Sequence, residues 1–392
     1  MAERIAVAGA GPVGLCAALL LARHGHEVTV FEKREELSPA SRASTFHPPT
    51  LDLLDRLGVL SEAEPLGRRI DEIHYYRCLL GRPTLAACFP MSLLAGSTQH
   101  PYRLHLEQAL MTPLLLRALG ACVRARVVFD AEVTALHQHD GVVDVVVRGG
   151  GALKPHRFDR LIGADGAHSA VRTAAGLAFD GVDYEKRVLR VMTPLDLRQW
   201  VPGLAGISYL YDGADSISLL EMRHVWRIII RLPASISDEA ALNPAFIARE
   251  TARFLPLGEP LPIVSTDIYR TSQRVASAYG AGRVLLAGDA AHVTNTRGGM
   301  NMNCGLHDAW ALAQAFAQAD PNAALTRYAA ERRAVVMQEL IPHTDRLVDG
   351  GASWLAAVER ISRDPERTDA FLRSAAMVDI APPGLLTGGL AS

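Results

Sequence analysis

The fold is decided by a glycine-rich stretch near the N-terminus, Ile5-Ala-Val-Ala-Gly9-Ala-Gly11-Pro12-Val13-Gly14. The apolar run before the glycines predicts a buried strand, and the small and apolar residues from Val13 to His24 predict a helix. A second strand is predicted over Glu27–Phe31. The resulting strand–turn–helix–strand unit of about 30 residues has the size of a parallel βαβ crossover.

Each glycine of this stretch has a separate physical role. Gly9 permits a tight turn, Gly11 lets the backbone approach a pyrophosphate, and Gly14 lets helix and strand pack closely. The free N–H groups and partial positive charge at the helix N-terminus favour phosphates. Glu32 follows Gly14 by 18 residues, where a carboxylate can accept hydrogen bonds from an adenosine ribose. The stretch therefore predicts a dinucleotide site that suits FAD and NAD alike; the alternative is a glycine-rich turn of an unrelated α/β fold.

Length and composition limit the classes of protein that remain. The chain has 392 residues, of which 49% are hydrophobic, so it can bury the core of two domains or of one interleaved domain. A formal net charge of −2, without blocks of like charge, argues against nucleic acid as a partner. The five cysteines show neither metal-ligand nor disulfide spacing, and the sequence shows no leader and no apolar stretch of about 20 residues. We therefore expect a cytoplasmic protein without a metal, membrane or nucleic-acid partner.

Further elements are expected along the rest of the chain. Helices are predicted at Pro48–Leu57, Gln108–Leu119, Cys304–Gln318, Ala323–Leu340 and Trp354–Ser362. Antiparallel strands are predicted at Val123–Phe129, Glu132–His137 and Gly141–Arg148, and further β segments at Gly206–Tyr211, Ser216–Glu221 and Trp226–Leu232. Short buried strands are predicted at Leu161–Ala164 and Val284–Ala287, and a loose tail at Ile380–Ser392. If the two buried strands share a sheet with Ile5–Ala8, the intervening β segments form a second layer.

Two more motifs follow these buried strands. They read Leu161-Ile-Gly-Ala-Asp165-Gly166-Ala-His-Ser-Ala-Val-Arg172 and Gly282-Arg-Val-Leu-Leu-Ala-Gly288-Asp289-Ala-Ala-His292. The pair resembles the Asp-Gly and Gly-Asp motifs of class A FAD-dependent aromatic hydroxylases, the p-hydroxybenzoate hydroxylase type of flavoprotein. The order and spacing of all three motifs match that family, from the N-terminus to about Leu340. The resemblance implies that the dinucleotide is FAD.

The same resemblance implies an architecture. We expect an α/β fold in which a Rossmann-like FAD-binding domain of the GR2 type is interleaved with a β-sheet substrate domain. The FAD-binding domain is expected to comprise residues 1–75, 100–175 and 275–340. The substrate domain is expected to comprise residues 76–99 and 176–274, and residues 341–392 are expected to form C-terminal helices and a tail. The protein is expected to be a monomer or a homodimer.

The resemblance also implies roles for single residues. In the family the Gly-Asp carboxylate, here Asp289, contacts the FAD ribityl or ribose, and the Asp-Gly segment lies near FAD and the pyridine nucleotide. Arg42 and Gln108 match family residues that reach the cofactor. The residues expected to bind the cofactor are Gly9, Gly11, Pro12, Val13, Gly14, Glu32, Lys33, Arg42, Gln108, Asp165, Gly166, Gly288, Asp289, Gly299, Met300 and Asn301. The residues expected to act in catalysis are Arg223, Thr296, Gly298 and Gly299.

The implied reaction is a hydroxylation. NADPH or NADH delivers a hydride, dioxygen adds to the flavin C4a carbon, and the C4a-hydroperoxyflavin passes one oxygen to an aromatic ring, a phenol or an aromatic acid. In the family, the segment after the Gly-Asp motif, here Asn295–Gly305, approaches the flavin and leads into a helix, whose N-terminus would stabilise negative charge on the reduced ring. The family usually carries a proline at the place of Thr296 and a glycine at that of Asn301, although asparagine tolerates a left-handed conformation.

These two departures keep other functions open. A flavoprotein oxidase or reductase on the same scaffold is one alternative, and a catalytically weak FAD-binding protein is another. Candidate residues for the wall of the substrate site are Tyr209, Tyr211, Leu220, Met222, Arg223, Trp226 and Arg227. Arg223 or Arg227 would pair with an anionic group of the substrate. His292 is expected to be structural and Cys304 to be a small buried thiol.

Overall fold

The computed structural model describes residues 2–40, 43–139, 141–349 and 351–386. A six-stranded sheet has the order β20-β21-β12-β1-β2-β8, with every neighbouring pair from β21 to β8 parallel and β20 antiparallel. Its strands are β1 (Arg4–Ala8), β2 (Glu27–Phe31), β8 (Ala125–Val128), β12 (Arg160–Gly163), β20 (Gly280–Ala281) and β21 (Val284–Leu286). The three strands that precede the glycine-bearing motifs are therefore neighbours in one sheet, which confirms the condition set by the sequence.

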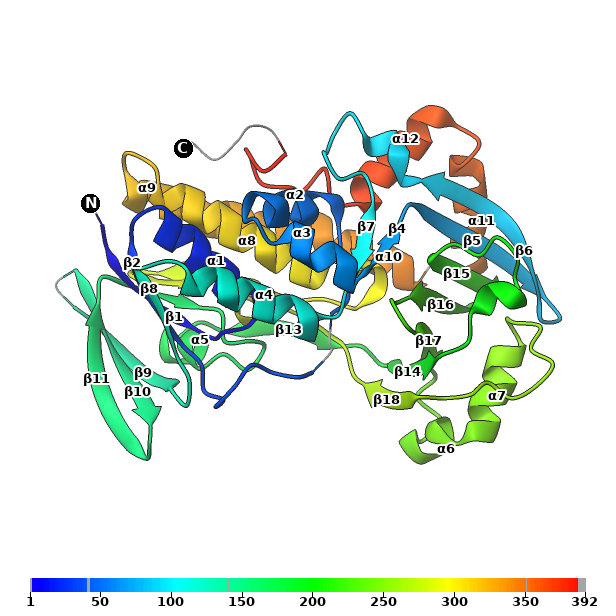
Figure 1. The fold of residues 1–392 in the computed structure, drawn as a ribbon, viewed down its shortest axis with the longest axis horizontal. Coiled ribbons are helices and arrows are strands. Elements are labelled where there is room, and N and C mark those ends of the chain that lie inside the picture. The colour runs from blue at the N-terminus through cyan, green and yellow to red at the C-terminus, as the bar shows by residue number, and fades with distance from the viewer. Residues whose placement is uncertain (1, 41–42, 140, 350, 387–392) are drawn as a thin grey trace.

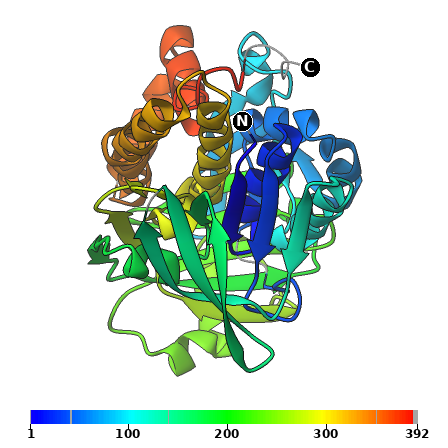
Figure 2. The same cartoon turned by 90° about the vertical axis from the view of Figure 1, so that its left-hand side faces the viewer.

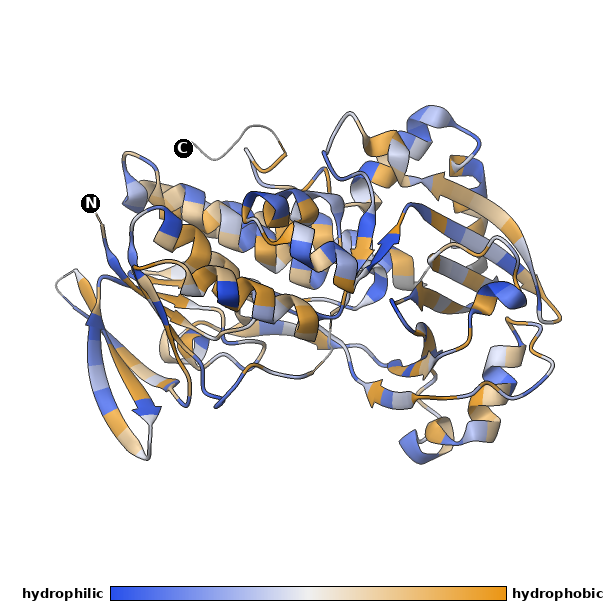
Figure 3. Cartoon of the chain, viewed as in Figure 1, coloured by the Kyte–Doolittle hydropathy of each residue, from blue (hydrophilic) through white to orange (hydrophobic). Residues whose placement is uncertain are grey.

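Two layers cover this sheet (Figure 2). One face packs against the helices α1 (Pro12–Arg23), α4 (Gln108–Gly120) and α8 (Asn301–Phe316), and the other against an antiparallel sheet of β9 (Glu132–His139), β10 (Val142–Gly149) and β11 (Ala152–Phe158). Because side chains alternate along a strand, Ile5 and Val7 of β1 join the core under the helices, whereas Ala6 and Ala8 join the core under the second sheet. Helix α1 is buried along almost its whole length and is largely coloured as hydrophobic in Figure 3.

One strand prediction is wrong in its sheet. The segment Val123–Phe129 contains β8, but β8 pairs in parallel with β2 and not with β9. It is the edge of the parallel sheet and is only partly covered, so its side chains give the mixed pattern of an antiparallel strand. The partner of β10 besides β9 is β11, whose mainly exposed residues include a lysine and a proline and give no strand signal.

A seven-stranded sheet forms the second β layer, in the order β18-β14-β17-β16-β15-β5-β6 (Figure 1). Its strands are β5 (Glu72–Leu79), β6 (Arg82–Pro90), β14 (Arg187–Thr193), β15 (Ile207–Asp212), β16 (Asp215–Glu221), β17 (Trp226–Leu232) and β18 (Ser265–Tyr269). Helices α6 (Asp238–Leu242) and α7 (Pro244–Ala252) pack on one face, and α11 (Gly351–Ile361) and α12 (Pro365–Ala375) cover part of the other. The chain thus passes from one sheet to the other and back, while the domain boundaries themselves remain a prediction.

Smaller elements connect these layers. One three-stranded sheet contains β3 (Thr45–Phe46), β4 (Arg68–Ile70) and β7 (Arg103–His105). Another contains β13 (Phe179–Asp183), β19 (Ser272–Ala276) and β22 (His292–Val293). The short helices are α2 (Pro48–Arg56), α3 (Leu60–Ala63) and α5 (Ala170–Ala174). Within the described ranges, no helix combines the length and the apolar character that crossing a bilayer requires.

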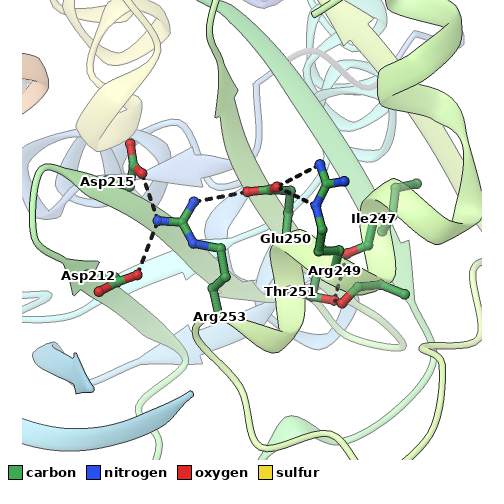
Figure 4. A network of polar contacts seen from close by, with 8 residues as sticks. Asp212, Asp215, Ile247, Arg249, Glu250, Thr251 and Arg253 are labelled. Atoms are coloured by element: carbon green, nitrogen blue, oxygen red, sulfur yellow. Dashed lines mark hydrogen bonds and ion pairs between the residues drawn. The ribbon is translucent and has the colours of Figure 1, made fainter. Parts of the chain in front are cut away.

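A charged network fixes α7 to the seven-stranded sheet (Figure 4). Arg253, which follows α7, donates from Nη2 to the carboxylates of Asp212 at 3.1 Å and Asp215 at 2.7 Å. Its Nη1 donates to Glu250 at 3.1 Å. Because Asp212 and Asp215 flank the β15–β16 turn, one guanidinium joins a helix and a hairpin that lie far apart in sequence.

The C-terminal part is more ordered than the sequence predicts. The predicted helix Ala323–Leu340 is α9 (Pro321–Val335) followed by a π-helical turn at Val336–Leu340, and α10 (Ile341–Asp349) continues from it. The expectation of a loose tail is wrong for its first half. The Trp310 indole N–H donates to the Pro383 carbonyl at 3.3 Å, and Leu385 is fully buried, because the tail supplies apolar cover for α8. Residues 387–392 lie outside the described ranges.

Candidate functional site

The first glycine turn has the geometry of a phosphate cradle. Gly9 has φ +101°, and a Cβ there would lie 2.4 Å from the Ala164 carbonyl oxygen. A Cβ on Gly14 would lie 2.0 Å from the Gly9 carbonyl oxygen. At Gly11, by contrast, a Cβ would meet nothing within 4 Å, so this turn is open in front of the α1 N-terminus. Gly9 and Gly14 thus serve close packing, and Gly11 leaves room for a ligand that approaches the backbone.

Four further residues that were predicted to bind the cofactor lie around this turn: Pro12, Val13, Glu32 and Lys33. Pro12 is the first residue of α1, where its missing N–H costs nothing. The Val13 side chain points toward Gly288 of the Gly-Asp motif and toward Gly305 of α8. Glu32 follows β2, and its Oε2 accepts a 2.8 Å hydrogen bond from the Ala10 N–H, so the carboxylate lies across the turn. Lys33 is exposed beside it.

The Asp-Gly motif uses its carboxylate locally. Asp165 Oδ1 accepts from the Ser169 hydroxyl at 2.5 Å, and Oδ2 accepts from the backbone N–H groups of Ala170 and Val171 at 2.8 and 3.2 Å. Asp165 therefore fixes the start of α5, and Gly166 makes the preceding turn with φ +88°. A direct contact of either residue with the cofactor remains a prediction.

The Gly-Asp motif meets the first turn by close backbone packing. Gly288 has φ +62°, and a Cβ there would lie 3.0 Å from the Val13 side chain. A Cβ on Gly305 of α8 would come within 2.8 Å of both the Gly288 Cα and the Val13 side chain. Only small residues allow α1, α8 and this turn to converge. Because β1, β12 and β21 are parallel neighbours, Asp289, which follows β21, lies at the same sheet edge as the open turn at Gly11.

A glycine-bearing segment leads from this turn into α8. Gly298 and Gly299 have φ +83° and +67°, and a Cβ on Gly299 would lie 2.8 Å from the Thr45 Cβ. Buried Asn303 locks the segment, because its Nδ2 donates to the carbonyls of Gly299 and Thr45 at 2.8 Å each. Met300 is the buried N-cap of α8, and Thr296 is exposed. A role of Thr296 in catalysis remains a prediction.

Asn301 is helical and not left-handed, because it begins α8. Its Nδ2 donates to Asp289 Oδ1 at 2.8 Å, and its Oδ1 lies 3.1 Å from His292 Nδ1. His292 Nε2 lies 2.9 Å from Asp308 Oδ2, and the Arg332 Nε donates to Asp308 Oδ1 at 2.8 Å. The side chain that replaces the family's glycine therefore links the Gly-Asp carboxylate to a buried charged cluster.

The donor atoms of His292, Cys304 and Asp308 lie within 4.8 Å of one another, close enough to hold a metal ion. The Arg332 guanidinium, however, contacts both the Asp308 carboxylate and the Cys304 sulfur, the latter at 3.2 Å. A cation of the protein itself already balances the carboxylate. The buried position of Cys304 agrees with its expected character as a small core thiol.

Arg297 joins the glycine segment to the seven-stranded sheet. Its guanidinium is buried, donates to the Tyr211 hydroxyl at 2.7 Å and the Ser216 hydroxyl at 3.1 Å, and lies 4.9 Å from the centre of the Tyr209 ring. Tyr209 and Tyr211 are two of the residues predicted for the substrate wall. They lie on the face of β15 opposite to Leu210, with Tyr75 beside them.

Two arginines, Arg223 and Arg227, were predicted to pair with an anion, and their surroundings differ from each other and from those of a third arginine in β17. Arg223 is exposed in the turn between β16 and β17. Arg227 is buried and donates to the Ser44 hydroxyl at 2.7 Å and to Glu107 at 3.1 Å. Arg231, the third arginine, was not predicted from the sequence; its buried Nη1 has no hydrogen-bond partner among the described residues. Burial and the nearby Arg297 charge lower the pKa of Arg231 to about 9.

Arg231 and Arg297 were overlooked for different reasons. In β17 the arginines at 227 and 231 share one face with Ile229, while Ile228, Ile230 and Leu232 face the core, and this alternation is visible in the sequence. It would have pointed to Arg231. Arg297 stands inside a motif whose glycines draw attention, and only the fold shows which sheet it reaches. Gln108 begins α4, and Arg42 lies outside the described residues.

Known proteins are similar to this chain in sequence and in fold. The profile of a family described as an FAD binding domain matches residues 3–341. A para-nitrophenol 4-monooxygenase from Pseudomonas sp. (strain WBC-3) is 31% identical over 383 residues, which cover 95% of this chain and 92% of the relative. A 6-hydroxy-3-succinoylpyridine 3-monooxygenase from Pseudomonas putida (strain DSM 28022 / S16) is 29% identical, with 95% and 97% covered. The crystal structure of p-nitrophenol 4-monooxygenase from Pseudomonas putida DLL-E4 matches this fold with a TM-score of 0.86 at 27% identity, covering 96% of this chain and 98% of that one.

Proposed function

This chain belongs to the family of class A FAD-dependent aromatic hydroxylases, and we propose that it adds one oxygen atom from dioxygen to a phenolic ring at the expense of NADPH or NADH. FAD, when bound, supplies the electron transfer from the pyridine nucleotide and the activation of dioxygen. The protein's own residues bind the cofactor, orient the substrate and exclude water.

One observation supports the proposal most directly. Three glycine-bearing turns lie at the carboxyl ends of the adjacent parallel strands β1, β12 and β21, where ligands bind in open α/β sheets. The N-terminus of α1 faces the open turn at Gly11 and would hold the pyrophosphate, and Glu32 and Asp289 would accept hydrogen bonds from the cofactor's hydroxyls. The N-terminus of α8 would stabilise negative charge on the flavin ring.

The substrate is proposed to lie between the glycine segment and the seven-stranded sheet. Tyr209 and Tyr211 offer aromatic surface there, held in place by the Arg297 guanidinium. A buried guanidinium N–H without a partner costs about 1–3 kcal/mol, so the Arg231 Nη1 is expected to gain one when substrate binds. A phenolate or another anionic group on the ring meets that requirement, and a nitrophenol, the substrate in the name of two relatives, ionises readily.

The test begins with purified protein. Its visible spectrum is recorded for bound FAD, and the oxidation of NADPH and of NADH is followed with a panel of phenols and aromatic acids while peroxide is quantified. We expect bound FAD, an acceleration by an acidic phenol, and little peroxide. Bound FAD with every turnover ending as peroxide would point to an oxidase instead, and bound FAD without turnover would point to a binding protein.

A further inference from the structure

A continuous chain of polar side chains leads from the cofactor site into the protein core. Asp289 accepts from Asn301, Asn301 contacts His292, and His292 contacts Asp308 at distances of 2.8, 3.1 and 2.9 Å. Arg332 of α9 closes the chain by donating to Asp308 at 2.8 Å. The side chains of His292 and Asp308 are 0% exposed, so water does not compete for these contacts.

The hydrogen-bond roles along this chain are mutually consistent only for a cationic His292. Asn301 must turn its amide N–H toward the Asp289 carboxylate, which leaves its oxygen facing His292 Nδ1. Nδ1 must therefore donate, and Nε2 must donate to the Asp308 carboxylate. An imidazole that donates from both nitrogens is protonated.

The groups around His292 support that charge. Burial alone would lower its pKa, but Cys304 and Asp308 raise the pKa of His292 well above its usual value. The Arg332 guanidinium of α9 pairs with the same Asp308 carboxylate at 2.8 Å, and the Tyr279 ring stacks on the His292 ring with the ring centres 6.1 Å apart. Asp308 also accepts from the Gly288 N–H at 3.1 Å, so the same carboxylate holds both the turn and the histidine.

We propose that His292 is a positioning residue for FAD: acting through Asn301, it holds the Asp289 carboxylate in the orientation that receives the cofactor's hydroxyls. The inference rests on the proposed placement of FAD at the Gly-Asp turn. Asn301, in the place where the family usually has a glycine, supplies the connection. A glycine there would leave Asp289 without this donor.

The test measures FAD affinity and not turnover. Apoprotein is titrated with FAD, and the quenching of flavin fluorescence gives Kd. His292→Gln keeps the volume but cannot donate in both directions, and Asn301→Ala removes the link, so each should weaken FAD binding about tenfold. The double variant should bind no more weakly than Asn301→Ala, because the link is already cut. Losses that add in the double variant would indicate a general structural role and overturn the proposal.

Two further variants separate positioning from folding. Asn301→Asp keeps the size and the contact with His292 but cannot donate to Asp289; it should bind FAD at least as weakly as Asn301→Ala while the apoprotein Tm is maintained. His74→Gln is the matched control, since His74 is also buried and bonded to a carboxylate, 2.8 Å from Glu72, but lies in β5. Wild-type affinity in His292→Gln or in Asn301→Asp would overturn the inference, whereas a wild-type apoprotein that does not bind FAD would overturn the proposed function.

Discussion

Arg231 is the residue on which the proposed substrate class rests. Its buried Nη1 faces a region in which Arg297 adds a second positive charge, and the hydroxyls of Tyr269, Tyr211 and Tyr209 lie near enough to affect its ionisation. Two arginines close to one site repel each other, and an anion between them offsets that repulsion. An anionic ring substituent would stabilise both.

Replacing Arg231 should therefore damage the use of acidic phenols in particular. Hydrogen bonds to charged groups contribute about 1.5–3 kcal/mol, so Arg231→Met should lower kcat/KM for 4-nitrophenol by about tenfold to a hundredfold. Steady-state kinetics for Arg231→Met and Arg223→Met, compared side by side, measure this. The opposite ranking, with Arg223→Met the more damaging, would favour the residue chosen from the sequence.

Buried histidines link stability to pH. His307 is fully buried beside Thr50, and burial together with the Arg332 charge lowers its pKa from 6.5 to about 3. The unfolded chain therefore takes up a proton at His307 as the pH falls below 6.5, while the folded chain does not until about pH 3. Stability is lost progressively across that window, and the loss from this group reaches about 2 kcal/mol at pH 5.

Urea unfolding at pH 7 and pH 5 tests this linkage. In His307→Gln, the difference in the free energy of unfolding between the two pH values should shrink by about 2 kcal/mol relative to wild type. His224→Gln, at an exposed turn position, serves as the comparison. An unchanged difference in His307→Gln would mean that this histidine is not kept neutral by the fold.

At the scale of the elements, the glycine turn before α1 separates packing from ligand binding. Gly11 has extended backbone angles that alanine can adopt, and its Cβ would meet nothing within 4 Å. Gly14 is different, because its Cβ would collide with the Gly9 carbonyl at 2.0 Å. One turn thus combines an open glycine and a packing glycine three residues apart.

The two alanine variants should fail in different ways. Gly11→Ala should keep the Tm of the apoprotein and weaken FAD binding by tenfold or more, because the methyl group occupies the approach to the turn. Gly14→Ala should lose about 2 kcal/mol or more of stability through overpacking. Thermal unfolding of the apoproteins and FAD titration measure both. If Gly11→Ala bound FAD like wild type, the pyrophosphate would lie elsewhere.

The contribution of the Arg253 network, which joins α7 to the β15–β16 hairpin, to the free energy of unfolding can be tested separately. Arg253 meets three carboxylates but is 36% exposed, so screening by water reduces what each pair contributes. Arg253→Met should lower the free energy of unfolding by about 1 kcal/mol in urea. Arg249→Met, which removes a 67% exposed partner of Glu250, should cost less. Equal losses in the two variants would contradict a role for the network in joining these elements.

At the scale of the whole molecule, the turns were predicted correctly because they depend on local backbone constraints. The turns at Gly9, Gly288 and Gly299 require positive φ or close approach, and such requirements are written directly in the sequence. The sheet of β8, by contrast, depends on which strand lies beside it, and the order of the C-terminal tail depends on contact with Trp310. Neither contact leaves a local pattern.

The candidate site shows the same division. Asp289 was found through its motif, but the motif could not show that Asn301 would be helical and bonded to it, since that contact arises only when α8 docks. The alternation along β17 marks Arg231 in the sequence, but only the fold shows that Arg231 lies near the Arg297 charge. The prediction of the cofactor side of the site therefore comes from motifs, and the proposal for its substrate side comes from tertiary contacts.

Oxygen transfer to the substrate tests the central proposal most directly. Purified protein with FAD and NADPH or NADH is incubated with an acidic phenol under 18O2, and the product is examined by mass spectrometry. The proposal predicts a hydroxylated product that carries one 18O atom, formed in step with nicotinamide oxidation. A product without 18O, or nicotinamide oxidation that yields only labelled peroxide, would contradict it.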